Sequence, residues 1–266
     1  MATILTPRPA ATVLTLREGT NGYEILMLRR NLNSDFVGGA YVFPGGGVDP
    51  ADASEVAQQL SVGMSEASCS ARLGIMSGGL AYYVACLREL FEEGGILIAC
   101  DDQGHEIDIA NRPLVDRLNR ARDLVNNGSL RFVELLQREG LSLDLRNIAY
   151  LAHWVTPVGP PRRYDTRFFV ALSPEGQVAG HDDYETVASK WIRPVDALAM
   201  HARGELEMIF PTIRNLEIVA QFDTAQEVLD YANALVEIPK IEPRMLERDG
   251  ELTILVPGDN GYDEGI

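Results

Sequence analysis

The stretch ACLRELFEEGGILIA, residues 85–99, places three glutamates within five positions of an otherwise apolar segment. The spacing of its apolar residues predicts a helix over 80–93, which stops at the two glycines that follow because glycine adopts positive φ freely. On a helix, Glu89, Glu92 and Glu93 occupy positions i, i+3 and i+4, so their carboxylates share one face. The stretch therefore predicts an acidic cluster in the last turn of a largely apolar helix.

Such a cluster is unfavourable unless something neutralises it. Like charges at this spacing cost about 0.2–0.5 kcal/mol per pair, and the helix dipole disfavours negative charge in the last turn. One interpretation is a solvated acidic face with Arg88 as the local counter-ion. The other is a site for a hard divalent cation, since Mg²⁺ uses few carboxylates and completes its shell with water and substrate phosphates.

The composition is that of an acidic chain with enough apolar residues for a sizeable core. Of its 266 residues, 46% are hydrophobic, and the formal net charge of −16 disfavours nucleic acid or an anionic membrane as a partner. We expect no membrane span and no secretory leader, because no apolar run is long enough for either. The three cysteines lack metal-ligand spacing. Cys86 and Cys100 are expected to be buried thiols in a cytoplasmic protein.

The other apolar patterns predict one α/β domain with helical additions. A hairpin is expected over 12–30, where GTNG supplies the turn. Residues 53–80 predict one or two short helices, and 112–139 predict two helices with Ser129 as the N-cap of the second. Helical additions are expected to continue over 194–235. Further strands are expected at 96–99, 148–157, 166–172, 188–194 and within 251–262.

The segment 88–96 resembles the second half of the Nudix box, R-E-U-x-E-E-x-G-U with U apolar. Every fixed position is filled, by Arg88, Glu89, Leu90, Glu92, Glu93, Gly95 and Ile96. At ordinary residue frequencies a chance match in a chain of this length is on the order of one in a thousand or rarer. The resemblance implies a Nudix-type α/β/α sandwich around a mixed β-sheet, with additional helices, as a single domain over residues 1–266.

The first half of the box, G-x5-E, is expected just upstream. Gly46 is followed at the right distance by Asp52, an acid but not the glutamate of the family. Residues 53–87 then intervene where the family has a short spacer, so the box carries an insertion. Each doubling of a loop costs only about 0.6 kcal/mol, so the site survives if the glycine loop still packs against the helix. We expect residues 53–80 to form a helical excursion over the active site, as a specificity element or as a decoration.

Further stretches resemble one subgroup, the Nudix hydrolases similar to the peroxisomal acyl-coenzyme A diphosphatases, which also tolerate a long insertion in the box. These stretches are 28–31, 36–49, 156–171 and 182–198. The resemblance implies hydrolysis of a nucleoside diphosphate linked to another group. Coenzyme A or an acyl-coenzyme A is the favoured substrate, and the partner is thus a small nucleotide-type molecule. A homodimer is left open.

The resemblance also assigns a metal site. Nudix enzymes use Mg²⁺ or Mn²⁺ to neutralise the pyrophosphate and activate water. The expected ligands are Glu89, Glu92 and Glu93 with the backbone carbonyl of Gly45, and Glu89 and Glu93 are the leading catalytic candidates. Supporting roles are expected for Arg88, which orients a glutamate by a charge-assisted bond, and for Asp52 and Gly46.

A base for the attacking water can come from the box or from a later loop. Glu185 is the catalytic candidate outside the box, because its loop precedes a strand where the family often places a base or a metal ligand. The alternative carries equal weight: Glu185 is then a surface acid beside Asp182 and Asp183.

Substrate phosphates need cations, and five arginines fall in two short segments: Arg29, Arg30, Arg162, Arg163 and Arg167. Arginine binds phosphate bidentately, although strand-end arginines are commonly solvated. Arg29, Arg30 and Arg163 are the predicted substrate-binding members. Tyr164 and Phe43 are predicted to stack on adenine, with a core or turn role as the alternative for Phe43.

Other functions compete with this interpretation. ADP-ribose, NADH and nucleotide sugars are open as substrates of the same chemistry. A Nudix domain retained as a non-catalytic ligand sensor is a different class, but such sensors commonly lose box glutamates and all three are present here. A structural protein with a chance acidic helix is the remaining class.

Overall fold

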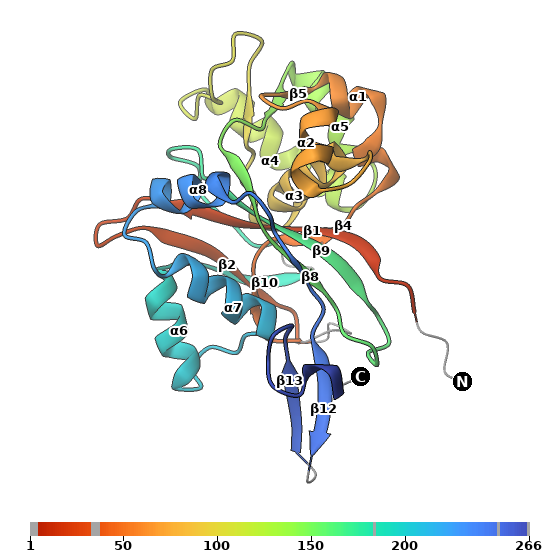
Figure 1. Ribbon diagram of the computed structural model, residues 1–266. Helices are drawn as coiled ribbons and strands as arrows, with labels where there is room; N and C mark the ends of the chain where they lie inside the picture. The colour runs from red at the N-terminus through yellow and green to blue at the C-terminus, as the bar shows by residue number, and fades with distance from the viewer. Residues whose placement is uncertain (1–4, 33–37, 183–184, 249–250, 265–266) are drawn as a thin grey trace.

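The computed structural model describes residues 5–32, 38–182, 185–248 and 251–264, so the start of the stretch 36–49 lies outside it. A mixed eight-stranded sheet forms the centre, and helices cover both of its faces (Figure 1). This is the α/β/α sandwich that the sequence predicts. Within the described ranges, no helix is both long enough and apolar enough to cross a membrane.

Six strands form the main path of the sheet, in the order β10-β2-β1-β9-β8-β11. Their bounds are β1 Arg8–Arg17, β2 Glu24–Arg30, β8 Ile148–Val155, β9 Tyr164–Leu172, β10 Thr186–Ile192 and β11 Lys240–Ile241. Two short strands lie off this path and pair with two of its inner strands, β3 (Tyr41–Val42) with β2 and β4 (Gly45–Gly47) with β1. The β1–β9 and β8–β11 pairs are parallel and the others are antiparallel, so the sheet is mixed as expected.

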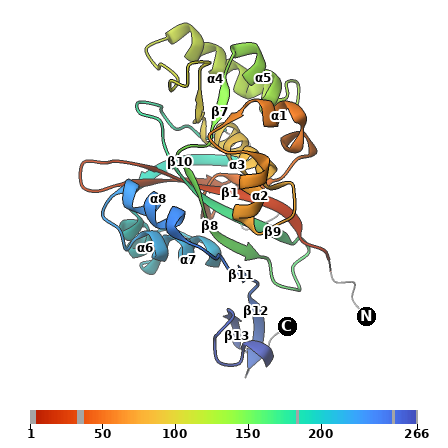
Figure 2. The same cartoon turned by 45° about the horizontal axis from the view of Figure 1, so that its top comes forward.

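The helices divide between the two faces (Figures 1 and 2). One face carries α1 Glu55–Gln59, α2 Glu66–Leu73, α3 Gly79–Gly94, α4 Arg112–Asn126 and α5 Phe132–Glu139; the other carries α6 Pro194–Ala202, α7 Phe210–Val219 and α8 Ala225–Ala234. Each face has its own apolar core. Because β8 lies between the two cores, all eight of its residues are buried, which explains why all of them except His153 are apolar or aromatic.

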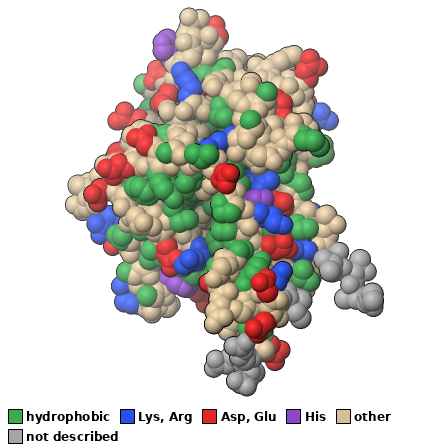
Figure 3. Space-filling model, in the orientation of Figure 1, with side chains coloured by type: hydrophobic (Ala, Val, Ile, Leu, Met, Phe, Trp, Pro, Cys, Tyr) green, Lys and Arg blue, Asp and Glu red, His purple; other side chains and the backbone are tan. Residues whose placement is uncertain are grey.

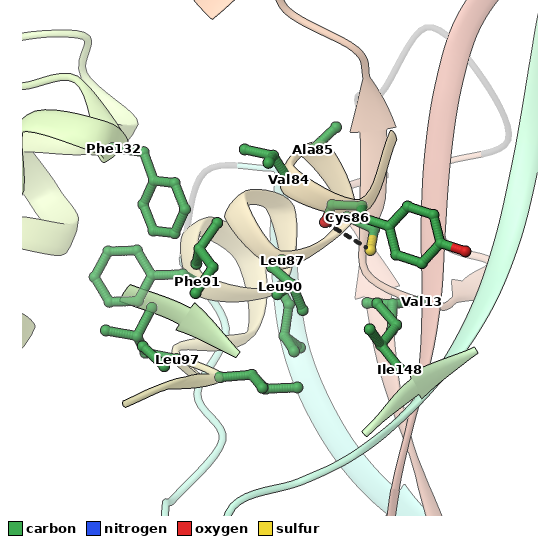
Figure 4. Packing of buried hydrophobic residues seen from close by; sticks show 14 of the residues in the cluster. Val13, Val84, Ala85, Cys86, Leu87, Leu90, Phe91, Leu97, Phe132 and Ile148 are labelled. Carbon is green, nitrogen blue, oxygen red and sulfur yellow. Dashed lines mark hydrogen bonds between the residues drawn. The ribbon is translucent and has the colours of Figure 1, made fainter. Parts of the chain in front are cut away.

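Helix α3 is the centre of the first core (Figure 4). Leu90 and Val13 both belong to this core and are fully buried between the helix and β1. On another side of the helix, Phe91 lies against Phe132 of α5, with ring centroids 5.7 Å apart. The helix is thus held from both sides, and it ends at Gly95, whose φ of 69° terminates it as predicted.

Helix α2 of the insertion does not lie over the glutamates. The carboxylate of Glu66 in α2 accepts backbone N–H bonds from Gly78 (2.6 Å) and Leu80 (2.9 Å), at the first turn of α3. Arg72 of α2 also donates to the backbone carbonyls of Ala232 and Leu235 at the end of α8. The glutamates are in the last turn of α3, which is about 20 Å away at 1.5 Å per residue. The expectation of an excursion over the active site is therefore wrong for α2, which caps the far end of the helix instead.

Two smaller sheets complete the structure. A three-stranded sheet, in the order β5-β7-β6, joins the insertion to the segment after α3; its strands are β5 Ser61–Val62, β6 Ala99–Cys100 and β7 Ser142–Asp144. The hairpin of β12 Arg244–Arg248 and β13 Glu251–Leu255 extends away from the helices near the C-terminus (Figure 1). The expected strand over 96–99 is thus reduced to β6, because only there does a partner strand lie alongside.

Local details confirm some expectations and correct others. The β1–β2 hairpin forms, with Leu16 opposite Ile25. The predicted N-cap at Ser129 is wrong, since α5 begins after Arg131 and has no side-chain cap. All three cysteines are free and buried. On the face shown in Figure 3, basic side chains are scattered among acidic ones and form no continuous basic surface.

Candidate active site

The three glutamates lie at the C-terminal end of α3, largely shielded from water. Glu93 is 4% exposed, and the side chains of Glu89 and Glu92 are 14% and 20% exposed. A solvated acidic face would leave such side chains in water. Their burial therefore favours a site over the interpretation of a solvated face.

Arg88 forms hydrogen bonds to both halves of the box. Its Nε and Nη2 donate to the two carboxylate oxygens of Asp52, each at 3.0 Å, and Nη2 also donates to the carbonyl of Gly47 at 2.8 Å. Its Nη1 donates to Glu89 at 2.8 Å and to Glu92 at 3.0 Å. Asp52 is 2% exposed, so this bidentate pair is buried. Despite the insertion, the arginine thus holds the glycine strand and two glutamates in one arrangement.

The glycines let β4 approach the helix end closely. The N–H of Gly45 donates to Oε2 of Glu93 at 3.0 Å. A Cβ atom at Gly46 would lie 2.4 Å from Oε1 of Glu89, and one at Gly45 would lie 2.4 Å from Oγ1 of Thr12. Any side chain at either position would therefore displace a carboxylate or the neighbouring strand.

The carboxylates are only partly compensated by positive charge. Burial raises the pKa of Glu89 to about 7, against the lowering effect of Arg88. Burial and the charge of Glu89 raise the pKa of Glu93 well above its usual value, against the N–H of Gly45 and the charge of Arg30. Each carboxylate therefore disfavours ionisation of the other, and a bound cation would relieve both.

The residues fit a divalent cation held by two carboxylates better than one held by three. In the described part of the chain, no group of three or more His, Cys, Asp and Glu side chains is arranged to hold a metal ion. Glu89 and Glu92 both accept a bond from Arg88, but Glu89, like Glu93, also faces the glycine strand. Mg²⁺ commonly takes one or two carboxylates and completes its shell with water and phosphate oxygens. Glu89 and Glu93 are therefore the side chains that would hold it.

Glu185 lies near this cluster. It is exposed, and its negative charge contributes to the raised pKa of Glu89 and Glu93. Its backbone carbonyl accepts the N–H of Asn31, directly after β2, and the strand that follows is irregular between Thr186 and Ala188. The loop thus brings an exposed carboxylate within electrostatic reach of the buried ones, as the predicted role as a base requires.

Arg122 and Asn126, on one face of α4, contact the end of α3 and were not predicted. Arg122 donates from Nε to the carbonyl of Glu92 at 2.9 Å and from Nη2 to the carbonyl of Glu93 at 2.7 Å. Asn126 donates to Glu92 at 3.2 Å. These bonds satisfy carbonyls left without helical partners and place a positive charge at the negative end of the dipole. No local pattern in α4 shows that it would reach α3.

A cavity of about 410 Å³ adjoins the site on the opposite face of the sheet. Arg30, Gly45, Phe43 and Tyr164 are among the residues that line it, so four of the predicted residues lie around one space. Phe43 is 3% exposed and packs in the second core, which favours its core role over stacking on adenine. Arg29 is exposed and donates to the carbonyl of Gly39 at 3.3 Å.

Arg163 is not placed to bind a substrate. It is 6% exposed; its Nε donates to the carbonyls of Thr156 and Pro157, its Nη1 to Leu5, and its Nη2 to Glu242. With these bonds, the guanidinium anchors the chain that leads to the β12–β13 hairpin. The prediction of a substrate-binding role is therefore wrong, because burial and tertiary partners occupy the side chain.

Arg167 is likewise a structural residue. It is 6% exposed and donates to His153 and to the hydroxyl of Tyr150, with Asp165 at 3.9 Å. Its guanidinium carbon lies 5.7 Å from the ring centroid of Tyr82 on α3. The apolar face of β9 therefore contains a paired arginine that stabilises the packing of α3.

Comparison with known proteins agrees with this geometry. A family model described as the NUDT19 Nudix domain matches residues 65–219, more than half of the chain. The chain belongs to this Nudix family. The matched range of this Nudix hydrolase includes the second half of the box, Arg122 and Glu185, whereas Gly45, Asp52 and the β12–β13 hairpin lie outside it.

Alignments with similar proteins extend over most of this Nudix hydrolase. The acyl-coenzyme A diphosphatase NUDT19 of Xenopus laevis is 23% identical over an alignment of 280 residues that covers 93% of this chain and 73% of that protein. The protein of the same name from Gallus gallus is 28% identical over 281 residues, with 92% and 74% covered. The crystal structure of a Nudix hydrolase from Alicyclobacillus acidocaldarius matches with a TM-score of 0.66 and 28% identity, over 85% of this chain and 96% of that one.

Proposed function

We propose that this Nudix hydrolase cleaves the pyrophosphate bond of coenzyme A or an acyl-coenzyme A in the presence of Mg²⁺ or Mn²⁺. The products are 3′,5′-ADP and (acyl-)phosphopantetheine. The observation that carries the proposal is the buried pair Glu89 and Glu93 facing Gly45 and Gly46 beside an apolar cavity. The names of the relatives at 23% and 28% identity support the choice of substrate.

The site residues have separate roles in the proposed reaction. When bound, the divalent cation neutralises the pyrophosphate and lowers the pKa of water. Glu89 and Glu93 would hold the cation, and Arg88 keeps Glu89 in place. Arg30 lies near Glu93 and lines the cavity, where its guanidinium can bind a phosphate oxygen. Glu185, which is exposed beside the cluster, accepts the proton of the attacking water.

A panel of substrates tests the proposal. The purified protein is incubated with coenzyme A, acetyl-coenzyme A, ADP-ribose, NADH or ATP, with Mg²⁺, Mn²⁺ or EDTA, and the products are identified by mass spectrometry. Metal-dependent release of 3′,5′-ADP and phosphopantetheine, absent from Glu93→Gln, is the expected result. Cleavage of ADP-ribose or NADH alone would replace the substrate but keep the chemistry. Tight binding without any turnover would identify a ligand sensor.

A further inference from the structure

We infer that the apolar cavity receives the acyl-pantetheine arm of the substrate, and that Met245 and Ile254 of the β12–β13 hairpin determine which acyl chains fit. The inference rests on the proposed function for the pyrophosphate, and it adds which half of the substrate enters the cavity. No comparison assigns a role to this hairpin, which lies beyond the matched range 65–219.

The cavity is built from three parts of the fold. Its floor is the sheet face opposite α3, where Trp154 of β8 and Phe168 of β9 lie. Its far wall is the start of α7, with Phe210 set edge-on to Trp154 at a centroid distance of 5.8 Å. Met245 and Ile254 close the remaining side. A volume of about 410 Å³ is within the range of ordinary small-molecule sites.

The polarity of the cavity decides which half of the substrate it suits. Among the described residues that line it, Arg30 alone is charged, and it lies at the end near Glu93. The interior is aromatic and aliphatic, and its uncharged side-chain polar groups are the hydroxyls of Thr12, Thr156, Thr166, Thr212 and Tyr164 and the indole N–H of Trp154. The nucleoside half of coenzyme A carries a 3′-phosphate, which needs a cation that the interior does not supply. The other half is a long uncharged chain with amide groups, which threonine hydroxyls can bind.

The hairpin presents an apolar pair to this space. Met245 and Ile254 are directly opposite each other in the β12–β13 ladder, and Ile254 is 42% exposed. The next residue, Thr253, points to the other face, since successive side chains alternate along a strand. It does not line the cavity.

The hairpin is anchored by contacts outside the cavity. Arg163 pairs with Glu242 just before β12, and the hydroxyl of Tyr262 donates to the carbonyl of Glu242 at 2.8 Å. The guanidinium of Arg244 lies 4.5 Å from the ring centroid of Tyr262. These contacts hold the wall in position before any substrate binds.

A binding measurement tests the inference without catalysis. The chain has two tryptophans, Trp154 in the cavity and Trp191 beside Arg17, so Trp191→Phe leaves Trp154 as the single tryptophan, which is excited selectively over tyrosine. In this background S-octanoyl-pantetheine, which has no phosphate, is titrated without metal. We expect a saturable change in Trp154 fluorescence, weakened about tenfold or more by Ile254→Gln and little altered by Thr253→Gln. No saturable change, equal weakening by both variants, or a response to 3′,5′-ADP instead would overturn the inference.

Hydrolysis of an acyl series then separates the two proposals. From acetyl- to octanoyl-coenzyme A, kcat/KM is expected to rise up to about fourfold per methylene until the cavity is full. Ile254→Gln should flatten this dependence, whereas Thr253→Gln should retain it. An unchanged dependence in Ile254→Gln would refute the role of the hairpin while leaving the proposed activity intact. Binding of S-octanoyl-pantetheine without cleavage of any coenzyme A derivative would refute the activity and leave the cavity assignment standing.

Discussion

The guanidinium of Arg122 donates to the backbone carbonyl of Glu93 at 2.7 Å, so a helix outside the Nudix box holds the end of the helix that carries the box. The same nitrogen donates to the carbonyl of Gly180 at 2.8 Å, and the N–H of Gly180 donates to Gly94 at 2.9 Å. Arg122 therefore joins the glutamates to the loop that leads to Glu185. It is a positioning residue, because these bonds are to backbone carbonyls and not to the carboxylates themselves.

Arg122→Ala is expected to lower kcat about tenfold and to weaken activation by Mg²⁺, because the last turn of α3 loses its bonds to a charged donor. Loss of such bonds also costs about 2 kcal/mol of stability. Arg122→Lys should restore part of both. Arg120→Ala, an exposed position on the same helix, is the control. The measurements are kcat as a function of Mg²⁺ concentration and the thermal unfolding of each variant. An unchanged dependence of kcat on Mg²⁺ in Arg122→Ala would show that Arg122 does not position the glutamates.

Glu93→Gln should remain folded and lose about three orders of magnitude in kcat, because it removes charge from the proposed metal site. Glu92→Gln should lose far less, about tenfold or less, because Glu92 is directed to Arg88. Steady-state kinetics with saturating Mn²⁺ measures both. Equal losses would show that all three glutamates act together, as the sequence alone suggests.

Asp52→Asn is expected to affect stability more than turnover. It weakens a buried bidentate pair with Arg88, and breaking such pairs costs about 3–5 kcal/mol. Its kcat at 25 °C should fall much less than that of Glu93→Gln. Asp49→Asn is a matched control, since asparagine also caps the short helix that starts at Pro50. Urea unfolding followed by circular dichroism compares the two variants, and equal midpoints would contradict the structural role of Asp52.

The stability of the metal-free protein should fall as pH rises from about 4.5 to about 7. The pKa of Glu89 is raised to about 7 by burial, so the folded state holds a proton that the unfolded state has already released. This contribution to stability is fully present below the pKa that Glu89 has in the unfolded state, and it is lost as pH rises through its pKa in the folded state. Glu89→Gln should flatten this part of the profile. Added Mg²⁺ should stabilise the wild type more at pH 8 than at pH 5. Thermal melts at both pH values measure the effect, and a melting temperature that rises over this window would contradict it.

Glu185→Gln should lower kcat by about 10²–10⁴ with little change in KM, because a positioned base acts mainly in the chemical step. The pH profile of kcat should lose its acidic limb at the same time. Glu175→Gln, an exposed glutamate earlier in the same connection, is the control. A full acidic limb in Glu185→Gln would assign the base to the box itself.

Features with local causes were predicted correctly. Helix α3 begins and ends within one residue of the predicted bounds, because its apolar spacing and the conformation of Gly95 are properties of the segment itself. The clustering of Glu89 and Glu93 follows from helical geometry alone. The β1–β2 hairpin follows from a turn between two apolar runs.

Features that depend on distant partners were missed. Arg163 and Arg30 look alike in the sequence, yet Arg163 is buried under the chain that precedes β12 and Arg30 lines the cavity. The position of the insertion depends on Glu66 reaching the first turn of α3, and the support of α3 depends on Arg122. Each of these relations joins segments whose pairing no local pattern encodes.

The pairing of Asp52 with Arg88 has a consequence for how the chain folds. Because residues 53–87 lie between the two, the pair closes a long loop that contains the whole insertion. Closing such a loop lowers the entropy of the chain before the stabilising contacts form, and this slows the formation of the Asp52–Arg88 pair. The catalytic end of α3 is therefore expected to be among the last parts of the protein to acquire its native contacts, so a newly made chain would be compact before it is competent.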